Sequence, residues 1–269
     1  MNLLQSIFLG IVQGLTEFLP VSSSGHLVLL QRFLRLEMGA DVAFEVFLHL
    51  GTLLAVLIYF RKLILDLALA LFKWRDSPQN QAHRYNRALI MYILAATLGT
   101  GLIYLIFGDW FESLYDQPLI VAFMLLVTGA IVFASDYMKG GSIPSVSMGL
   151  TRSVIIGLVQ GLAIIPGISR SGSTIGASLF CGLKRKDAAS FSFLLSIPAI
   201  LAANLKEFKV LASLQPSQFF IYLGGFVSAF GVAWLVISLL INMVQRGNLK
   251  YFAYYCWGVG VLSIILLVS

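Results

Sequence analysis

The sequence predicts an all-α integral membrane protein with six transmembrane helices and two re-entrant helical hairpins, arranged as an inverted repeat. Three observations support this prediction: an apolar composition, six long apolar segments, and two broken segments that share a motif. Apolar residues make up 59% of the 269 residues and Asp, Glu, Lys and Arg only 11%, whereas soluble domains average about 45–50% and about 25%. The mean hydropathy of +0.91 indicates that lipid surrounds most of the chain.

The charged residues and the cysteines exclude several other classes of protein. The net charge of +6 comes from 18 Lys and Arg residues, which cluster between apolar runs and form no basic stripe with interleaved aromatic side chains. This argues against nucleic-acid binding. Cys181 and Cys256 have neither CxxC nor metal-ligand spacing, so no disulfide framework or zinc site is expected. Gln13, Thr16 and Glu17 lie where a signal peptide would be apolar, so cleavage is not expected either.

Six segments are long and apolar enough to cross a hydrocarbon core of about 30 Å, which takes about 20 helical residues. They comprise residues 42–60, 88–107, 118–138, 188–205, 217–241 and 251–268. The two hairpins and these six spans account for the whole chain, which is therefore expected to form a single membrane domain, residues 1–269.

Basic residues between the spans predict their orientation, because Lys and Arg accumulate in cytoplasmic loops. The 61–87 connection contains six of them, whereas the 108–117 connection contains three acidic residues and no basic one. Alternation of the spans then places 13 Lys and Arg residues inside and four outside. The 108–117 connection is therefore expected on the outer side.

The first broken segment lies at the N-terminus. Residues 1–19 have a helical pattern that ends at Pro20 and the serines 22–24, and the apolar segment that resumes at His26 has only nine residues. We expect a helix–loop–helix hairpin that returns to its own side, with a loop satisfied by protein or by a watery cavity. The alternative, a simple span over residues 1–19, would reverse the charge bias or leave residues 26–41 without a place.

The second broken segment repeats the first. Residues 153–165 are apolar, Pro166-Gly167 and residues 169–172 interrupt the pattern, and the apolar run then continues to Leu183. The shared motif consists of two pairs of segments: Gln13-Gly14-Leu15 and Val21-Ser22-Ser23-Ser24-Gly25 recur 147 residues later as Gln160-Gly161-Leu162 and Ile168-Ser169-Arg170-Ser171-Gly172.

This repeat predicts the topology of the chain. A returning hairpin followed by three spans ends on the opposite side from its start, so the second copy is expected to be inverted relative to the first. Repeat 1 would comprise about residues 1–138 and repeat 2 about residues 150–269. In many transporters, inverted repeats with Gly- and Pro-interrupted helices meet at the substrate site near the middle of the membrane.

Each hairpin is expected to place a turn rich in Ser and Gly at the start of a helix. The first N–H groups of a helix have no partner within the helix, and the helix dipole adds to their preference for an anion such as phosphate. At the shared offset Ser23 matches Arg170, whereas Glu17 and His26 have no acidic or imidazole counterpart. One copy therefore offers a cation, and the other offers an acid, a hydroxyl and an imidazole.

The intramembrane charges have both a functional and a structural interpretation. Arg170 is expensive inside a membrane and requires a partner, which could be phosphate oxygens or an ion pair with Glu17. Gln13 and Glu17 are four residues apart and share a helical face. An amide oxygen and one carboxylate would make a weak cation site, although Mg²⁺ often takes only one or two carboxylates plus substrate phosphates. A merely polar lining is the alternative for Gln13.

The serine motif is also open to two interpretations. Serines before a helix are commonly N-caps, but His26 is an ionisable ring that can serve as a general base for a loop hydroxyl. Ser23 is the candidate nucleophile, and Glu45 and His49, four residues apart, are expected to line the same cavity or pair with each other. Candidate phosphate donors are the remaining turn residues: Ser22, Ser24, Gly25, Ser169, Ser171, Gly172, Ser173 and Thr174.

The two motifs resemble the signature regions of the undecaprenyl-diphosphate phosphatase family, also called bacitracin-resistance proteins. The matching segments are residues 13–26, QGLTEFLPVSSSGH, and residues 166–172, PGISRSG. The resemblance covers the whole chain and assigns the site to Glu17, Ser23, His26 and Arg170. The sequence departs from the family at one position, since the first acidic residue of the Glu-rich motif is Gln13 here. This departure weakens a two-carboxylate metal site but not a phosphate site.

The resemblance implies an enzyme of the bacterial cytoplasmic membrane that removes the terminal phosphate of undecaprenyl diphosphate, with a site open to the outer side and a divalent cation, Mg²⁺ or Ca²⁺. Ser23 would attack phosphorus, with His26 or Glu17 as base, or a water would attack directly. The rival function is a transporter or flippase of a phosphorylated lipid or anion. The expected partners are a polyprenyl diphosphate and membrane lipids, with a homodimer left open.

Overall fold

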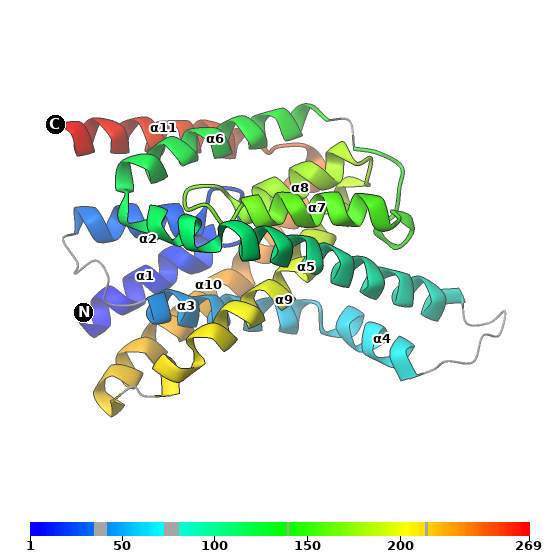
Figure 1. Ribbon diagram of the computed structural model, residues 1–269, viewed down its shortest axis with the longest axis horizontal. Helices are drawn as coiled ribbons and strands as arrows, with labels where there is room; N and C mark the ends of the chain where they lie inside the picture. The colour runs from blue at the N-terminus through cyan, green and yellow to red at the C-terminus, as the bar shows by residue number, and fades with distance from the viewer. Residues whose placement is uncertain (35–41, 73–80, 139, 213–214) are drawn as a thin grey trace.

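The computed structural model describes residues 1–34, 42–72, 81–138, 140–212 and 215–269, and this part of the chain is helical without a β-strand. Its helices form one bundle in which most axes run along the long direction of the molecule (Figure 1). Their bounds are α1 Leu3–Thr16, α2 Ser23–Phe33, α3 Val42–Tyr59, α4 Arg61–Phe72, α5 Gln81–Ser113, α6 Pro118–Tyr137, α7 Leu150–Leu162, α8 Arg170–Phe180, α9 Arg185–Ala212, α10 Pro216–Arg246 and α11 Lys250–Val268.

The chain has several helices long and apolar enough to cross a membrane, as the sequence predicts. In the described part, five helices qualify alone: α5, α6, α9, α10 and α11. A sixth span arises if α3 and α4 count together, although the chain bends by 77° between them. The chain is therefore a multi-pass membrane protein with an all-helical fold.

Part of the 61–87 connection is helical. Its first part forms α4, and α5 begins at Gln81 rather than at residue 88. The apolar side chains of α4 recur at helical spacing, and Leu67 and Ala70 are buried on one face. The basic residues that begin this connection predict its side of the membrane, and they do not indicate that an amphipathic helix follows. Residues 73–80 lie outside the described residues.

Both predicted breaks are present, and each places a serine at the start of a short helix. Pro20, which has no N–H group, lies between α1 and α2. Ser22 precedes α2 with φ of 67° and accepts a hydrogen bond from the Gly25 amide. In the second segment Ser169 caps α8 and accepts from the Gly172 amide. The two serines are therefore N-caps, whatever else they do.

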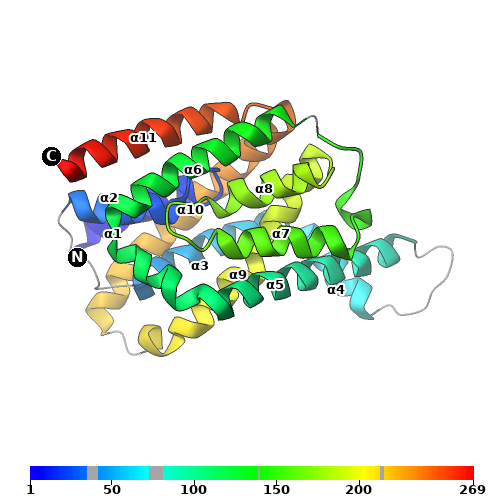
Figure 2. The same ribbon diagram turned by 45° about the horizontal axis from the view of Figure 1, so that its top comes forward.

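The first helix of each broken segment packs against a long helix from the other half of the chain. Helix α1 lies on α10 and α7 lies on α5 (Figure 2). Glycines permit this approach: a methyl group added at Gly10 would lie 2.3 Å from the carbonyl oxygen of Gly225, and one at Gly157 would lie 2.0 Å from that of Ala96. Neither contact tolerates a side chain, so the two halves are interleaved.

The core adjoins the loop between α1 and α2. Phe18 is fully buried and packs edge-on against Phe193 of α9, with ring centroids 5.1 Å apart. Phe193 also contacts Phe60 at 5.7 Å. Because Phe18 follows Glu17 directly, this aromatic packing anchors the backbone that carries the carboxylate.

Candidate active site

The carboxylate of Glu17 lies at the centre of the candidate site. It follows the last turn of α1, and only 6% of the residue is exposed. Its Oε1 atom accepts a hydrogen bond from Nη2 of Arg170, the first residue of α8. Its Oε2 atom accepts one from Oγ of Ser23, the first residue of α2, at 2.7 Å. The two broken segments thus meet, and they bring the predicted arginine, acid and serine together.

Two more side chains contact the same carboxylate. Gln13 Nε2 donates to Glu17 Oε2 at 2.8 Å, as expected for residues four apart on a helix. His49 Nε2 of α3 lies 3.3 Å from Glu17 Oε2, and His49 Nδ1 lies 3.2 Å from Gln13 Nε2. The carboxylate of Glu17 therefore contacts side chains from α1, α2, α3 and α8.

The guanidinium of Arg170 has a free donor in this site. Its Nη1 atom is buried and has no hydrogen-bond partner within the described part of the protein. A buried donor without an acceptor costs free energy, of the order of 1–3 kcal/mol or more when it is charged. The side chain as a whole is 17% exposed. A phosphate oxygen is the acceptor that a planar guanidinium fits best.

His26 faces away from the carboxylate. The residue is buried, with Nδ1 2.7 Å from the carbonyl oxygen of Ser22 and Nε2 2.9 Å from the hydroxyl of Tyr255 on α11. Among the described residues, both ring nitrogens are thus engaged and neither contacts Ser23. The expectation that His26 reaches a loop hydroxyl is not met by this geometry, whereas Glu17 is in hydrogen-bond contact with Ser23 Oγ.

The other predicted hydroxyls of the second loop are occupied within the protein. Ser171 donates to the carbonyl of Leu19 at 3.1 Å, which ties α8 to the first loop. Thr174 donates to the carbonyl of Arg170 at 2.8 Å and contacts Ser192 of α9 at 2.6 Å. These hydroxyls hold the loops in place, so they are not free phosphate donors in this conformation.

The remaining turn residues fall into two groups. Four of them are buried or half-buried serines: Ser22, Ser24, Ser169 and Ser173. The hydroxyl oxygens of Ser22 and Ser24 lie 3.3 Å from each other. The glycines Gly25 and Gly172 permit contact between the loops, since a methyl group at Gly25 would lie 3.0 Å from Gly167 Cα and one at Gly172 would lie 3.2 Å from Pro20 Cβ. The glycines therefore set the distance between the two segments.

A hydrogen bond rather than two facing oxygens joins Gln13 to Glu17 in this conformation. Gln13 turns its amide nitrogen toward Glu17, and its Oε1 atom is buried without a hydrogen-bond partner among the described residues. Both carboxylate oxygens of Glu17 already accept hydrogen bonds. Across the residues that can be described, no group of three or more His, Cys, Asp or Glu could hold a metal ion. Arg170 supplies the positive charge at this point.

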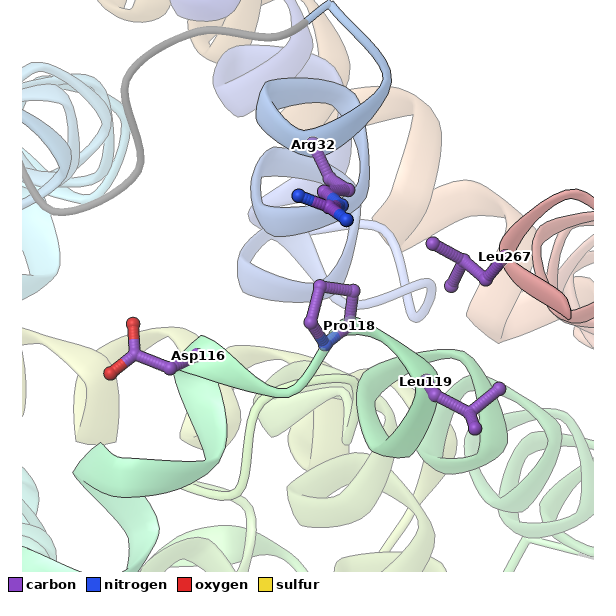
Figure 3. A pocket seen from close by; sticks show the side chains of 5 residues that line it. All are labelled: Arg32, Asp116, Pro118, Leu119 and Leu267. Atoms are coloured by element: carbon purple, nitrogen blue, oxygen red, sulfur yellow. The ribbon is translucent and has the colours of Figure 1, made fainter.

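A separate cavity of about 290 Å³ opens near the C-terminal end of α2. Figure 3 shows that Arg32 extends from α2 toward Pro118, while Asp116 points away from it. The lining residues are Arg32, Asp116, Pro118, Leu119 and Leu267. None of the predicted site residues lines this cavity, and both of its charged side chains are exposed.

Sequence reasoning missed the contacts of two residues. His49 was expected only near the site, yet it touches Glu17, and its position four residues after Glu45 gives a polar face at the start of α3 that points to this role. Tyr255 lies within an apolar span whose sequence carries no signal for its contact with His26. Only the packing of α11 beside the first loop reveals it.

An apolar helical bundle that encloses an arginine, a carboxylate and a serine hydroxyl defines an integral membrane protein with a site for an anionic group. The family described as bacitracin resistance protein BacA matches residues 6–262. The chain belongs to this family.

Curated relatives can be aligned with this chain over nearly their whole length. An undecaprenyl-diphosphatase of Methanobrevibacter smithii is 43% identical over 272 residues, which cover 97% of this chain and 96% of the relative. An undecaprenyl-diphosphatase of Methanosphaera stadtmanae is 40% identical, with 99% and 98% covered. One of Halothermothrix orenii is 42% identical, also with 99% and 98% covered.

Proposed function

We propose that this protein hydrolyses undecaprenyl diphosphate to undecaprenyl phosphate and inorganic phosphate. It thereby recycles the lipid carrier for peptidoglycan and other cell-wall polymers and confers resistance to bacitracin. The observation that carries this function is the buried Nη1 atom of Arg170, which has no acceptor among the residues that the structure describes and belongs to the side chain that binds Glu17, the hydrogen-bond partner of Ser23. The names of the relatives agree with it.

In the first step, Ser23 Oγ attacks the terminal phosphorus while its proton passes to Glu17 Oε2, 2.7 Å away. The bond from phosphorus to the bridging oxygen breaks, and undecaprenyl phosphate leaves. Arg170 donates to the phosphoryl oxygens, where charge spreads in a loose transition state. Fixed donors aimed at such charge supply much of the catalysis in phosphoryl transfer.

In the second step, water attacks the phosphorus of the phosphoserine. The bond from phosphorus to Ser23 Oγ breaks, and Ser23 recovers its proton from Glu17, so that the water oxygen and both of its protons leave with the phosphate. This cycle returns every group to its starting state. It gives the role of base to Glu17 rather than to His26.

The isoprenoid tail requires no polar recognition. The outer faces of the helices are apolar, as Leu105 and Phe180 illustrate with 83% and 76% exposure. The tail stays in the lipid while the diphosphate reaches Arg170. Because one chain supplies Glu17, Ser23 and Arg170, the reaction does not require a homodimer.

The family resemblance implies a divalent cation, Mg²⁺ or Ca²⁺. We propose that this cation is bound to the diphosphate as part of the substrate. The hydrogen bonds that Glu17 accepts support this assignment, because they occupy three of the roughly four acceptor positions of the carboxylate. The diphosphate then arrives as its cation complex. The rate of phosphate release would then follow the concentration of the Mg²⁺–diphosphate complex.

We also propose the arrangement as an inverted repeat with two re-entrant hairpins. Paired contacts support it: Ser6 Oγ donates to the carbonyl of Ile221, and Ser153 Oγ donates to the carbonyl of Tyr92. The two serines are 147 residues apart, the offset of the shared motif. Gly10 and Gly157, at their matching contacts with α10 and α5, are separated by the same offset.

The proposed topology predicts which residues face outward. In a chain whose Cys181 and Cys256 are replaced by alanine, Asp109→Cys is expected to react with a membrane-impermeant maleimide in intact spheroplasts. Lys62→Cys is expected to react only after the membrane is permeabilised, because positive residues face the cytoplasm. Both side chains are exposed, so accessibility in the folded protein is matched. The reverse pattern of labelling would exclude this orientation.

Phosphate release tests the function directly. The purified protein in detergent is expected to release inorganic phosphate from undecaprenyl diphosphate and to leave undecaprenyl monophosphate, as measured by a colorimetric assay and by mass spectrometry. A titration of Mg²⁺ against a chelator in the same assay examines the cation. Binding of the lipid without release of phosphate would instead support the transporter or flippase.

A further inference from the structure

His26 connects α11 to the backbone next to the nucleophile. Its Nδ1 atom lies 2.7 Å from the carbonyl oxygen of Ser22, and a carbonyl oxygen can only accept a hydrogen bond. Nδ1 therefore carries a hydrogen. In a neutral imidazole Nε2 is then an acceptor, and the hydroxyl of Tyr255 at 2.9 Å is its donor. The rings are parallel within 3° at 5.5 Å.

The carbonyl that His26 holds belongs to an unusual residue. Ser22 has φ of 67° and ψ of 96° and, within the described residues, is the only non-glycine with positive φ. Side chains other than glycine rarely adopt this conformation, and it persists only where surrounding contacts impose it. Ser22 immediately precedes Ser23, so its backbone determines where Ser23 Oγ lies relative to Glu17.

The tautomer of His26 decides whether the contact with Ser22 attracts or repels. With hydrogen on Nδ1, the ring donates to the carbonyl. With hydrogen on Nε2 alone, two lone pairs face each other across the same distance. The Ser22 carbonyl can only accept a hydrogen bond and so selects the Nδ1–H tautomer, whereas the Tyr255 hydroxyl can donate or accept and donates to Nε2 in this tautomer.

We infer that Tyr255 and His26 act as a positioning pair: the Tyr255 hydroxyl donates to Nε2 and orients the His26 ring, and His26 donates from Nδ1 to the strained Ser22 turn that presents Ser23. This inference rests on the proposed function and gives His26 a structural task within the site instead of a proton-transfer task. Tyr255 is 48% exposed and His26 is 7% exposed. The pair therefore extends from the periphery of α11 to the nucleophile.

Two replacements of His26 separate positioning from base catalysis. Asparagine places an amide nitrogen near the position of Nδ1 and can still donate to Ser22, whereas glutamine places its amide near Nε2 and cannot. We expect His26→Gln to lower kcat by about 100-fold, since small displacements of a reacting group have effects of this size. His26→Asn is expected to stay within about 10-fold of the wild type. Equal loss of activity in both variants would overturn the inference.

Replacing Tyr255 tests the other half of the pair. Tyr255→Phe is expected to lower kcat by about 10-fold with little change in KM, and to have no further effect in a His26→Asn background, because residues that act as a unit are not additive. Tyr254→Phe removes a neighbouring hydroxyl on a ring that packs against Trp257 instead and should retain activity. Equal losses from Tyr255→Phe in both backgrounds would contradict a role through His26.

A spectroscopic measurement tests the tautomer without reference to activity. The chain has three histidines, so ¹⁵N-histidine labelling gives few signals, and His26→Asn identifies the signal of His26. We expect a protonated Nδ1 and an unprotonated Nε2 in the wild type, and in Tyr255→Phe the same tautomer with a changed Nε2 chemical shift, because Nε2 loses its donor. An Nε2–H tautomer in the wild type would refute the pair even if phosphate release is normal. Absence of phosphate release with the expected tautomer would refute only the proposed function.

Discussion

Arg170→Lys is expected to lower kcat for phosphate release by about 10²–10³-fold, the range found when one fixed donor to a developing charge is lost. Lysine keeps the positive charge beside Glu17 but cannot donate from two nitrogens in one plane. In the wild type, Nη2 binds Glu17 and leaves Nη1 for the substrate. Steady-state phosphate release with undecaprenyl diphosphate measures the change.

The control for this variant is Arg152→Lys. Arg152 lies in α7 and donates to the carbonyls of Met148 and Cys181, far in sequence from the contacts of Glu17, and its replacement should leave kcat unchanged. Thermal unfolding in detergent checks that the Arg170 variant is folded, because Arg170 forms a buried ion pair with Glu17. Near-normal turnover by folded Arg170→Lys would contradict the role of the guanidinium.

Ser23→Ala is expected to reduce turnover by at least about 10³-fold, since the variant loses the nucleophile. The Arg170–Glu17 contact does not involve Ser23 and should persist. Acid quenching of the wild type with substrate labelled in its terminal phosphate should trap label on Ser23, and peptide mapping identifies the site. The labelled peptide should be absent from the variant.

Ser238→Ala provides a matched control on α10. Ser238 is exposed, and its hydroxyl contacts only the carbonyl of Leu235 in the same helix at 3.4 Å, so turnover and labelling should equal those of the wild type. Near-normal phosphate release by Ser23→Ala would exclude the phosphoserine and leave attack by water, with Glu17 as its base.

The positions of the helix breaks could be predicted because they depend on local chemistry. Pro20 and Gly167 interrupt a helical pattern in any environment, and α2 and α8 begin at Ser23 and Arg170, where the motif indicated. The bend between α3 and α4 was not predictable in this way. It occurs between Tyr59 and Arg61, without a proline or glycine, at Phe60, whose ring packs against Phe193 of α9.

The candidate site was predictable to the extent that its residues carry charge. A buried arginine requires a partner, and Glu17 is the acid of the first motif, so their contact follows from the cost of isolated charges in a membrane. The orientation of His26 did not follow, because it depends on which neighbour α11 supplies. The roles of Ser171 and Thr174 also depended on carbonyl groups whose positions only the folded backbone defines.

The interleaving of the two halves has a consequence for biosynthesis. Helix α1 can form its close glycine contact only when α10 is present, and α7 can form its own only when α5 is present. During translation the N-terminal hairpin therefore enters the bilayer before its packing partner exists. Its polar loop lacks these contacts until more than two hundred further residues have been inserted. We therefore expect the incomplete chain to depend on insertion factors that cover this polar loop.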